Sequence, residues 1–332
     1  MRVCVVGSVN MDLVVRCARL PKAGETLLGS AYRTYPGGKG ANQAVAARRL
    51  GAEVSLIASV GDDAHGKRVR EALEAEGVDL GGVVVREGEP SGLAMITVVE
   101  GGAEGGTGTI VVAPGANARL GEEDVARQAE MIRGCDVLLM QLEVPLGSVR
   151  RAAMIAREAG RTVMLNAAPA RALPADLLKM VDVLVVNRAE GASLMGVESS
   201  ADPARFGARL GELGPAAVVM TLGSAGSLLV HRGRVKRVGT PSVKCVDATG
   251  AGDAFCGALA AVWGGSGDSV RASEARSAEE LKRAEAAVAF ASGAGAAATM
   301  RAGALPSLPT RAQVEAVLGI AGTGVGSAAG VG

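Results

Sequence analysis

Short apolar segments alternate with amphipathic segments along this chain, and this order most constrains the fold. The runs RVCVV, VSLIASV, DVLLMQL, TVMLNA, DVLVVN and AVVMTL are continuous and rich in Val, Leu and Ile, as strands covered on both faces are. Between them lie ANQAVAARRL, EEDVARQAEMI and LGSVRRAAMIAREAG, each with one polar and one apolar face. We therefore predict an α/β fold with a mostly parallel central sheet flanked by helices.

Two regions interrupt this alternation. Residues 11–36 contain short extended pieces with turn residues, and residues 91–112 are typical of a β-hairpin with a glycine-rich turn at 101–108. We predict that these two regions form one small β-sheet, a lid over the ligand crevice. The α/β core is then made of residues 1–10, 37–90 and 113–319.

Two further segments are polar or made of small residues. Residues 264–280 are polar and contain glycine, which favours an exposed loop or a short helix. Residues 320–332 are of low complexity and have too little apolar surface to bury, so we predict a disordered tail.

The overall composition excludes several functional classes. The 332 residues contain 35 basic and 34 acidic side chains and no basic stripe with interleaved aromatics, so we expect no nucleic-acid or membrane partner. No apolar run approaches the roughly 18 residues of a membrane span. Five cysteines without CxxC spacing indicate free thiols in a reducing cytoplasm. The two histidines are far apart in sequence, which argues against a histidine metal site.

The segment DATGAGDAFCGALAAVW, residues 247–263, carries the strongest chemical signal. Phe255, Leu259 and Val262 have helical spacing and predict a buried helix face, whereas Gly250 and Gly252 precede it in a tight turn. A glycine-rich loop that opens a helix directs backbone N–H groups at an anion. Asp253 would lie beside that anion as a proton acceptor. Capping of the helix by Asp253 is the alternative interpretation.

Other polar segments follow predicted strands, where ligands bind in open α/β sheets. Asn42 in GGKGANQ and the pair Asn10 and Asp12 in GSVNMD are suited to the hydroxyl groups of a sugar. A turn before a helix and an Asx turn are the respective alternatives. TLGSAGS, residues 221–227, is either a nucleotide contact or a hairpin turn. NRAE, residues 187–190, is either a site for metal-bound water or a helix start.

Together, and in this order on one α/β chain, these segments resemble the ribokinase family of sugar kinases over roughly residues 2–318. Three blocks carry the resemblance: GSVNMDLV, GGKGANQAVAA and DATGAGDAFCGAL. The intervening LLMQLEVPL, VNRAE and TLGSAGS match the same pattern. The resemblance implies ATP-dependent phosphorylation of D-ribose at O5, which yields D-ribose 5-phosphate.

The resemblance also implies roles for individual residues. Asp253 corresponds to the general base, and Gly250, Ala251, Gly252 and Asp253 correspond to the anion hole. The implied sugar contacts are Asn10, Met11, Asp12, Gly38, Lys39, Gly40, Ala41, Asn42, Glu143 and Asp253. The implied nucleotide contacts are Asn187, Thr221, Leu222, Gly223, Ser224, Ala225, Gly226, Gly252, Asp253 and Ser292.

Two metal sites follow from the same resemblance. Mg²⁺, held through water, is expected near Asn187 and Glu190. A K⁺ ion beside the anion hole is expected at Asp247, Thr249, Ala298, Arg301, Gly303 and Ser307, partly through backbone carbonyls. The expected cofactors are therefore ATP, Mg²⁺ and K⁺.

Alternatives to this function remain open at the level of sequence. A related kinase that acts on deoxyribose, a ketohexose or a nucleoside has the same motifs. A sugar-binding regulator without catalysis would keep the fold, although the intact Asp253 and glycine loop argue against it. A dinucleotide-binding dehydrogenase is excluded because no GxGxxG follows the first strand. Pairing of two lids would protect their free edges, so we expect a homodimer.

Overall fold

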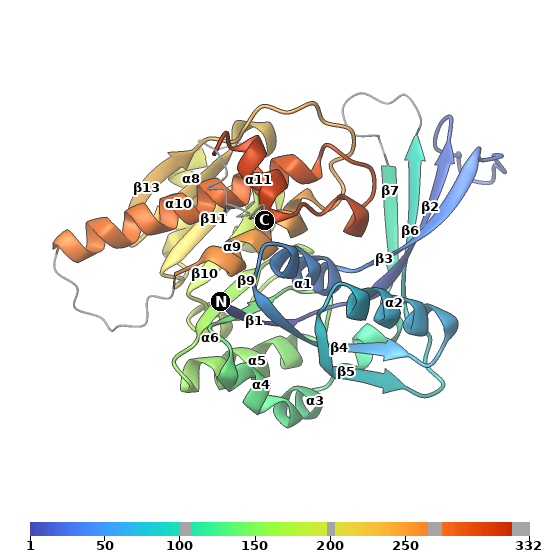
Figure 1. Cartoon of the computed structure of the whole chain (residues 1–332), viewed down its shortest axis with the longest axis horizontal. Coiled ribbons are helices and arrows are strands. Elements are labelled where there is room, and N and C mark those ends of the chain that lie inside the picture. The colour runs from blue at the N-terminus through green and yellow to red at the C-terminus, as the bar shows by residue number, and fades with distance from the viewer. Residues whose placement is uncertain (100–107, 198–202, 265–273, 321–332) are drawn as a thin grey trace, which may run out of the picture.

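The computed structural model describes residues 1–99, 108–197, 203–264 and 274–320. The chain forms one large sheet between two layers of helices and a second, smaller sheet at one end of the molecule (Figure 1). Most of the predicted turn at 101–108, part of the 264–280 segment and the predicted tail from residue 321 lie outside the described residues.

The large sheet has nine strands in the order β13-β12-β11-β10-β9-β8-β1-β4-β5. All neighbours from β11 to β5 are parallel, whereas β12 and β13 form an antiparallel hairpin at the other edge. This confirms the predicted, mostly parallel sheet. The strands are β1 (Arg2–Val6), β4 (Glu53–Gly61), β5 (Asp79–Arg86), β8 (Val137–Met140), β9 (Thr162–Asn166), β10 (Val183–Asn187), β11 (Ala217–Thr221), β12 (Ser227–His231) and β13 (Arg234–Val238).

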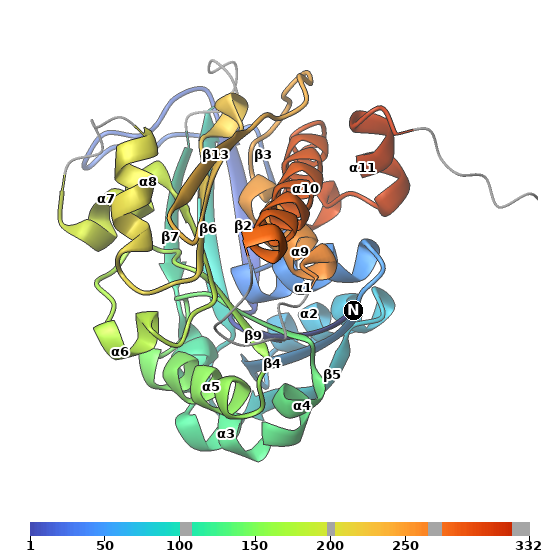
Figure 2. The ribbon, with the colours of Figure 1, turned by 90° about the vertical axis from the view of Figure 1, so that its left-hand side faces the viewer.

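Helices cover both faces of this sheet (Figure 1 and Figure 2). One layer contains α1 (Lys39–Arg49), α2 (Ala64–Ala75), α9 (Ala251–Val262), α10 (Glu274–Ala298) and α11 (Arg311–Val317). The other contains α3 (Glu122–Arg127), α4 (Ala129–Gly134), α5 (Leu146–Glu158), α6 (Ala175–Leu178), α7 (Arg188–Met195) and α8 (Pro203–Gly211). Three short 3₁₀ turns are η1 (Gly115–Arg119), η2 (Gly223–Ala225) and η3 (Leu305–Ser307).

Strand β1 explains why the apolar runs are continuous. Successive side chains of a strand point to opposite faces of its sheet. Val3 and Val5 pack under α1 and α9, whereas Cys4 and Val6 belong to the core on the side of α3, α4 and α5. Because both faces are buried, neither set of alternating positions is polar.

The smaller sheet has the order β3-β2-β6-β7, with β2 (Asn10–Cys17), β3 (Ala31–Gly37), β6 (Gly92–Val99) and β7 (Gly108–Ala113). Strand β2 pairs antiparallel with β3 and parallel with β6, and β6 pairs antiparallel with β7. The two regions expected to form one β-unit therefore lie in one sheet, which stands beside the main body in Figure 1.

Two helical predictions need correction. The segment EEDVARQAEMI is not one helix but two, α3 and α4, which meet at Gln128. The segment 264–280 overlaps the start of α10, which begins at Glu274 and runs for 25 residues. Its first turns are rich in charge and lack an apolar face, so their sequence is like that of a loop. Within the described ranges, no helix is long and apolar enough to cross a membrane.

Helices α1 and α9 cross closely at Gly257. A Cβ atom at this position would lie 2.5 Å from Ala46 Cβ and 2.6 Å from Gln43 O. Phe255 and Leu259 on α9 are buried, as their spacing predicts, whereas Val262 at the end of α9 is only partly buried. The absence of a side chain at Gly257 therefore lets the two helices approach until the start of α9 faces the start of α1.

We expect Gly257→Ala to destabilise the protein by about 2 kcal/mol, because the new methyl group must displace backbone atoms of α1 in a packed core. Urea unfolding followed by circular dichroism measures this change. Gly134→Ala in α4 is the matched control, since a Cβ atom there meets no heavy atom within 4 Å. Equal stability of the two variants would contradict the close crossing.

Candidate active site

Polar residues gather at the carboxyl ends of the central parallel strands. Asn166, Asn187 and Thr221 end β9, β10 and β11, and Gln141 follows β8 directly. Asn187 and Thr221 are paired in the register of their parallel strands. In open α/β sheets, ligands bind at this edge. The edge therefore provides one wall of the candidate site.

Asp253 lies above this edge in the first turn of α9 and is only 9% exposed. Its carboxylate accepts hydrogen bonds from Asn42 Nδ2 and Gln43 Nε2, each at 2.9 Å. The N-cap residue is Gly250, at φ 80°, and no side chain caps the helix. The capping interpretation of Asp253 is therefore wrong, because amides from α1 bind its carboxylate.

Asn42 has an unused acceptor beside this carboxylate. Its Nδ2 donates to Asp253, whereas its Oδ1 is buried and has no hydrogen-bond partner within the described residues. Buried polar atoms are rarely left unpaired, because each costs about 1–3 kcal/mol. A ligand hydroxyl that donates to Asn42 Oδ1 would satisfy it close to the Asp253 carboxylate.

A cavity of about 170 Å³ opens in front of Asp253. Its wall includes Lys39 from α1, Gly250 and Gly252 from the loop that opens α9, and the strand-end residue Thr221. The N–H of Ala251, which was expected in the anion hole, instead donates to Ala248 O at 3.2 Å. Of the four residues expected in the anion hole, Ala251 therefore has its N–H engaged within the protein.

Glu143 binds the start of α1 to the loop after β1. Its Oε2 accepts from the Ser8 hydroxyl and, at 3.2 Å, from Lys39 N. The next two N–H groups of α1, of Gly40 and Ala41, donate to Ser8 Oγ at 3.4 Å and Ser8 O at 3.0 Å. The amides that open α1 therefore have protein acceptors.

Met11 and Ala41 were expected at the sugar. Both side chains are fully buried in the apolar core on the side of α1 and α9. Met11 follows the alternation of β2, which places it on the opposite face from Asn10 and Asp12. Their contribution to a polar ligand is thus limited to their backbone groups.

Asn10 is oriented by Asn117 in η1, a residue that the sequence analysis missed. Asn117 Nδ2 donates to Asn10 Oδ1 at 2.7 Å and to Val9 O at 3.0 Å, and its Oδ1 accepts from Val9 N at 2.8 Å. The 3₁₀ turn η1 follows β7, so it also joins the small sheet to the core. Asn117 therefore links two connections between the sheets, the one from β1 to β2 and the one that follows β7.

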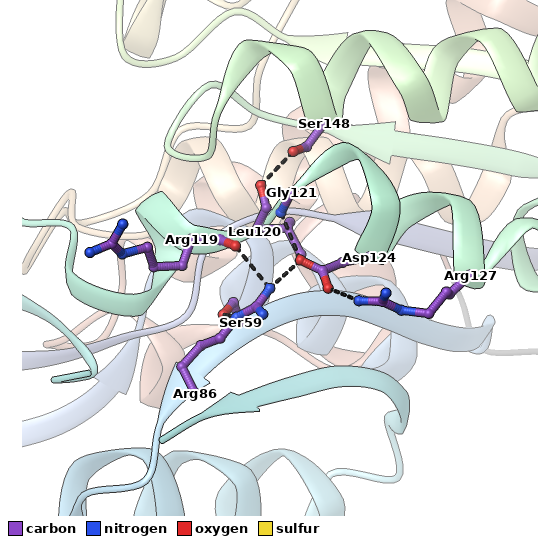
Figure 3. Close-up of polar contacts among 8 residues, drawn as sticks. All are labelled: Ser59, Arg86, Arg119, Leu120, Gly121, Asp124, Arg127 and Ser148. Atoms are coloured by element: carbon purple, nitrogen blue, oxygen red, sulfur yellow. Dashed lines mark hydrogen bonds and ion pairs between the residues drawn. The ribbon is translucent and has the colours of Figure 1, made fainter. Parts of the chain in front are cut away.

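A polar cluster holds η1 in place (Figure 3). Arg86 at the end of β5 forms an ion pair with Asp124 and donates to Arg119 O at 2.8 Å. Asp124 also accepts from Gly121 N at 2.8 Å and pairs with Arg127. The Asp124 side chain is only 5% exposed. Removal of one partner from such a buried pair would leave an uncompensated charge, which is strongly unfavourable. The cluster therefore anchors η1, and with it Asn117.

Charged groups of both signs face the cavity. Burial lowers the pKa of Lys39, but the carboxylates of Asp253, Glu143 and Glu190 outweigh burial, so the net pKa lies above its ordinary value. Burial raises the pKa of Glu190, although Asn187 N–H and Lys39 partly oppose it. Lys39 therefore remains a cation suited to a phosphate.

Asn187 and Glu190 are engaged with each other at the start of α7. Asn187 Oδ1 accepts from Glu190 N, and Asn187 N donates to Glu190 Oε2, both at 2.8 Å. This reciprocal capping box corresponds to the helix-start interpretation of NRAE. Both residues nevertheless line the cavity that contains Asp253.

The remaining expected nucleotide contacts lie in one region. Residues 221–226 connect β11 to β12 through η2, which also agrees with the hairpin interpretation of TLGSAGS. Ser292 on α10 is buried, and its Oγ lies 3.4 Å from Ser227 Oγ. The structure therefore brings Ser292 beside this hairpin, far from it in sequence.

The expected K⁺ positions also come together. Asp247 accepts from Thr249 N at 2.9 Å and from Gly303 N at 2.8 Å. Ser307 Oγ lies 3.5 Å from Thr249 O, and Arg301 N donates to Ala298 O at 3.4 Å. The segments around residues 247, 303 and 307 thus lie side by side next to the loop that opens α9.

Three amides behind Asp253 were not expected to matter: Gln43, Gln141 and Asn166. Gln43 Nε2 lies 3.1 Å from Asn166 Oδ1, and Gln141 Nε2 donates to Gln43 Oε1 at 2.6 Å. The available signals were the position of Gln43 next to Asn42 in GGKGANQAVAA and that of Gln141 directly after an apolar strand in LLMQLEVPL.

A family model described as pfkB family carbohydrate kinase matches residues 1–311. The chain belongs to this family. The pfkB family chain is 37% identical over 309 residues to the ribokinase of Haemophilus influenzae, covering 92% of this chain and 95% of that one. It is also 36% identical over 271 residues to a deoxyribokinase of Salmonella typhi, covering 81% and 87% of the two chains.

A solved structure gives the same result. The pfkB family chain superposes on Arabidopsis thaliana ribokinase complexed with ribose and ATP with a TM-score of 0.80 and 31% identity, over 96% of this chain and 98% of that one. The family and the fold expected from the sequence are therefore confirmed, and so is the expected enzyme class, a carbohydrate kinase.

Asp12 makes the stability of this pfkB kinase depend on pH. Burial, assisted by Glu143 and Asp253, raises its pKa to about 7, against about 3.9 in an unfolded chain. Ionisation of Asp12 is therefore less favourable in the folded than in the unfolded chain. Its contribution to the free energy of unfolding decreases as the pH rises from about 4 to about 7 and is constant above pH 7.

We expect Asp12→Asn to be more stable than the unchanged protein at pH 8, by about 2 kcal/mol, and the difference to shrink toward pH 5. Denaturant titrations at several pH values test this. Asp63→Asn is the control of opposite sign: burial raises the pKa of Asp63, but hydrogen bonds from Ser91 and Gly66 outweigh it and lower the net pKa. A difference for Asp12→Asn that is independent of pH would contradict the expectation.

Proposed function

We propose that the chain is an ATP-dependent ribokinase that transfers the γ-phosphoryl group of ATP to O5 of D-ribose and forms D-ribose 5-phosphate. The observation that carries this proposal is the Asp253 carboxylate, which lies in the wall of the cavity. It accepts hydrogen bonds from Asn42 Nδ2 and Gln43 Nε2, each at 2.9 Å. The ribokinase of Haemophilus influenzae and the complex of Arabidopsis ribokinase with ribose and ATP support the choice of substrates.

Asp253 would act as the general base. The sugar hydroxyls bind to Asn10, Asp12 and Asn42, with Glu143 behind them. The O5 hydroxyl then donates its proton to Asp253 as O5 attacks the γ-phosphorus, and the bond from that phosphorus to the bridging oxygen of ADP breaks. Phosphoryl transfer depends mostly on such positioning and on charge stabilisation.

The loop that opens α9 would stabilise the transferred group. Gly250, Gly252 and Asp253 line the cavity at the start of a 12-residue helix. Their N–H groups and the positive end of the helix favour the negative charge that spreads over the phosphoryl oxygens. Lys39, which remains charged among the surrounding carboxylates, adds a cation to the same cavity.

Mg²⁺ fits the donor groups near the strand ends. Glu190 and Asn187 provide hard oxygen atoms in the cavity wall, the type of donor that Mg²⁺ and its water ligands prefer. When bound, Mg²⁺ would neutralise charge on the phosphates of ATP. Because each side chain already takes part in the capping box, contact through water is favoured over direct coordination.

The small sheet would serve as the lid. We place the lid at residues 11–36 and 91–112 and the core at residues 1–10, 37–90 and 113–319. Asp12 on β2 then belongs to the lid, and Asn10, the first residue of β2, lies at the boundary on the core side. Closure over the sugar would exclude water, which otherwise competes with O5 for the phosphoryl group. The anchored turn η1 gives this movement a fixed base.

K⁺ would bind between the segments around residues 247, 303 and 307, beside the loop that opens α9. Asp247 accepts two backbone N–H groups there, so its charge organises the loop. Thr249 O and Ala298 O each accept one hydrogen bond and would offer their second lone pair to the cation. A bound K⁺ would then stabilise the shape of the anion hole without contact to the sugar.

A homodimer through the lid is the proposed assembly. Strand β7 is an edge strand, and Ile110 and Val111 on it are 61% and 67% exposed. Such an edge is usually protected by pairing. A mass of one chain in light scattering at micromolar concentration would contradict the dimer.

The proposed location is a reducing compartment such as the cytoplasm. Five free thiols, four of them buried, support this location.

Deoxyribose is the second candidate acceptor. The deoxyribokinase of Salmonella typhi is nearly as similar to this chain as the ribokinase of Haemophilus influenzae, at 36% and 37% identity. The two sugars differ in one hydroxyl group. The preference for ribose rests on the combined GSVNMD, GGKGAN and QLE segments.

Release of ADP from ATP and Mg²⁺ in a coupled assay, with a panel of sugars and nucleosides, tests the proposed function. We expect release to depend on D-ribose and to be faster in K⁺ than in Na⁺ or Tris buffer. Release of ADP with deoxyribose, a ketohexose or a nucleoside but not with D-ribose would assign that compound as the acceptor instead. No release with any acceptor, while ribose still binds, would support a regulator without catalysis.

We expect Asp253→Asn to lower kcat by about 10²- to 10⁴-fold, because the amide cannot accept the O5 proton. Ribose binding, measured by calorimetry, should remain within a few-fold. Asp63→Asn, in the N-cap of α2, is the control for loss of one carboxylate outside the site. Near-normal turnover of Asp253→Asn would remove Asp253 from the mechanism.

A further inference from the structure

A chain of buried amides runs from the sheet to Asp253. Asn166 Nδ2 donates to Val185 O at 3.3 Å, and Asn166 Oδ1 accepts from Gln43 Nε2 at 3.1 Å. The second N–H of Gln43 Nε2 points to Asp253 Oδ1 at 2.9 Å. Gln141 Nε2 completes the chain with a 2.6 Å hydrogen bond to Gln43 Oε1. Gln43 and Gln141 have no exposed surface.

The backbone carbonyl of Val185 determines how each amide in this chain is oriented. A carbonyl oxygen only accepts hydrogen bonds, so Asn166 must direct its NH₂ group to Val185 and its oxygen to Gln43. Gln43 must then direct its NH₂ group to Asn166 and Asp253, which leaves its oxygen to Gln141. The orientation of Gln43 is therefore imposed by strand β10, and its donor cannot turn away from the carboxylate.

The orientation of the Gln141 amide leaves one buried acceptor atom unpaired within the described part of the chain. Its Oε1 is buried and has no hydrogen-bond partner among the described residues, although an unpaired buried acceptor is unfavourable. The opposite orientation of the Gln141 amide would place two carbonyl oxygens against each other at Gln43. An unpaired acceptor kept behind the Asp253 carboxylate indicates a functional requirement for the Gln43 donor.

We propose that Gln43 is a positioning residue for the Asp253 carboxylate, with Gln141 and Asn166 holding its amide in place. This proposal rests on the proposed role of Asp253 as the general base. Asn42 Nδ2 binds Oδ2 and Gln43 Nε2 binds Oδ1, so each carboxylate oxygen has one neutral donor. Asn42 also has the unpaired Oδ1 that is proposed to accept a sugar hydroxyl. Among the described residues, the Gln43 amide instead binds only Asn166, Gln141 and the carboxylate. Gln43 thus fixes the direction in which Asp253 presents its free lone pairs.

The test is Gln43→Leu, which keeps the approximate volume and removes the donor. A carboxylate displaced by a fraction of an ångström transfers the proton poorly, so kcat should fall by about 10- to 100-fold. KM for ribose and for ATP should change less than about threefold. Because a donor that stabilises the charged form is lost, the acid limb of the pH profile of kcat should move to higher pH.

Two controls separate positioning from damage to the fold. Val45→Ala alters a fully buried apolar residue of the same helix and should lower the melting temperature without a change in kcat or in the pH profile. Gln43→Leu added to Asp253→Asn should cause no further loss of kcat, since Gln43 acts only through that carboxylate. A further loss equal to that of Gln43→Leu alone would overturn the proposal.

Gln43→Glu provides a second test should Gln43→Leu fold poorly. The introduced carboxyl can donate its proton to Asp253 when neutral but repels Asp253 when ionised. The kcat of this variant relative to the unchanged protein should therefore decrease as pH rises. A ratio that is constant from pH 6 to pH 9 would overturn the proposal.

The outcomes for Asp253 and Gln43 are distinguishable. Inactive Asp253→Asn together with normal kcat and pH profile in folded Gln43→Leu overturns the positioning role and leaves the proposed function intact. Near-normal turnover of Asp253→Asn overturns the proposed base, and with it the role assigned to Gln43.

Discussion

The close crossing of α1 and α9 at Gly257 is the constraint on which the site depends. It brings Asn42 and Gln43 from α1 against Asp253 at the start of α9. A buried carboxylate is unfavourable unless donors satisfy it, and α1 provides one donor for each oxygen. A larger residue at the crossing would separate the helices, and Asp253 would lose these partners. Helix packing and the chemistry of the carboxylate are therefore one property of this fold.

The sheet contributes through the positions where its strands end. Because the central strands are parallel, Asn166, Asn187 and Thr221 end at the same edge, and α9 begins above them. At the junction with the small sheet, η1 carries Asn117 to Asn10 and is itself held by Arg86 and Asp124. The residues proposed to bind sugar and nucleotide thus belong to separately anchored elements that meet at Asp253.

The charges of the site are balanced against burial. The carboxylates of Asp253, Glu143 and Glu190 raise the pKa of Lys39 against the effect of burial. Burial, together with Glu143 and Asp253, raises the pKa of Asp12 to about 7. An anionic nucleotide entering this region would meet Lys39 and the amides of the loop that opens α9, whereas a sugar with several hydroxyl groups would meet carboxylates that accept hydrogen bonds.

The sequence by itself determined the α/β class, the central strands, the two regions of the small sheet and the family, because apolar periodicity and glycine motifs are local. It also indicated Asp253, yet not whether Asp253 caps its helix or is bound by α1. The start of α10, the division between α3 and α4, and the roles of Gln43, Gln141, Asn166 and Asn117 were decided only by tertiary structure. Their partners lie far away in the chain, and a hydrogen bond between distant residues leaves no periodic signal in either segment.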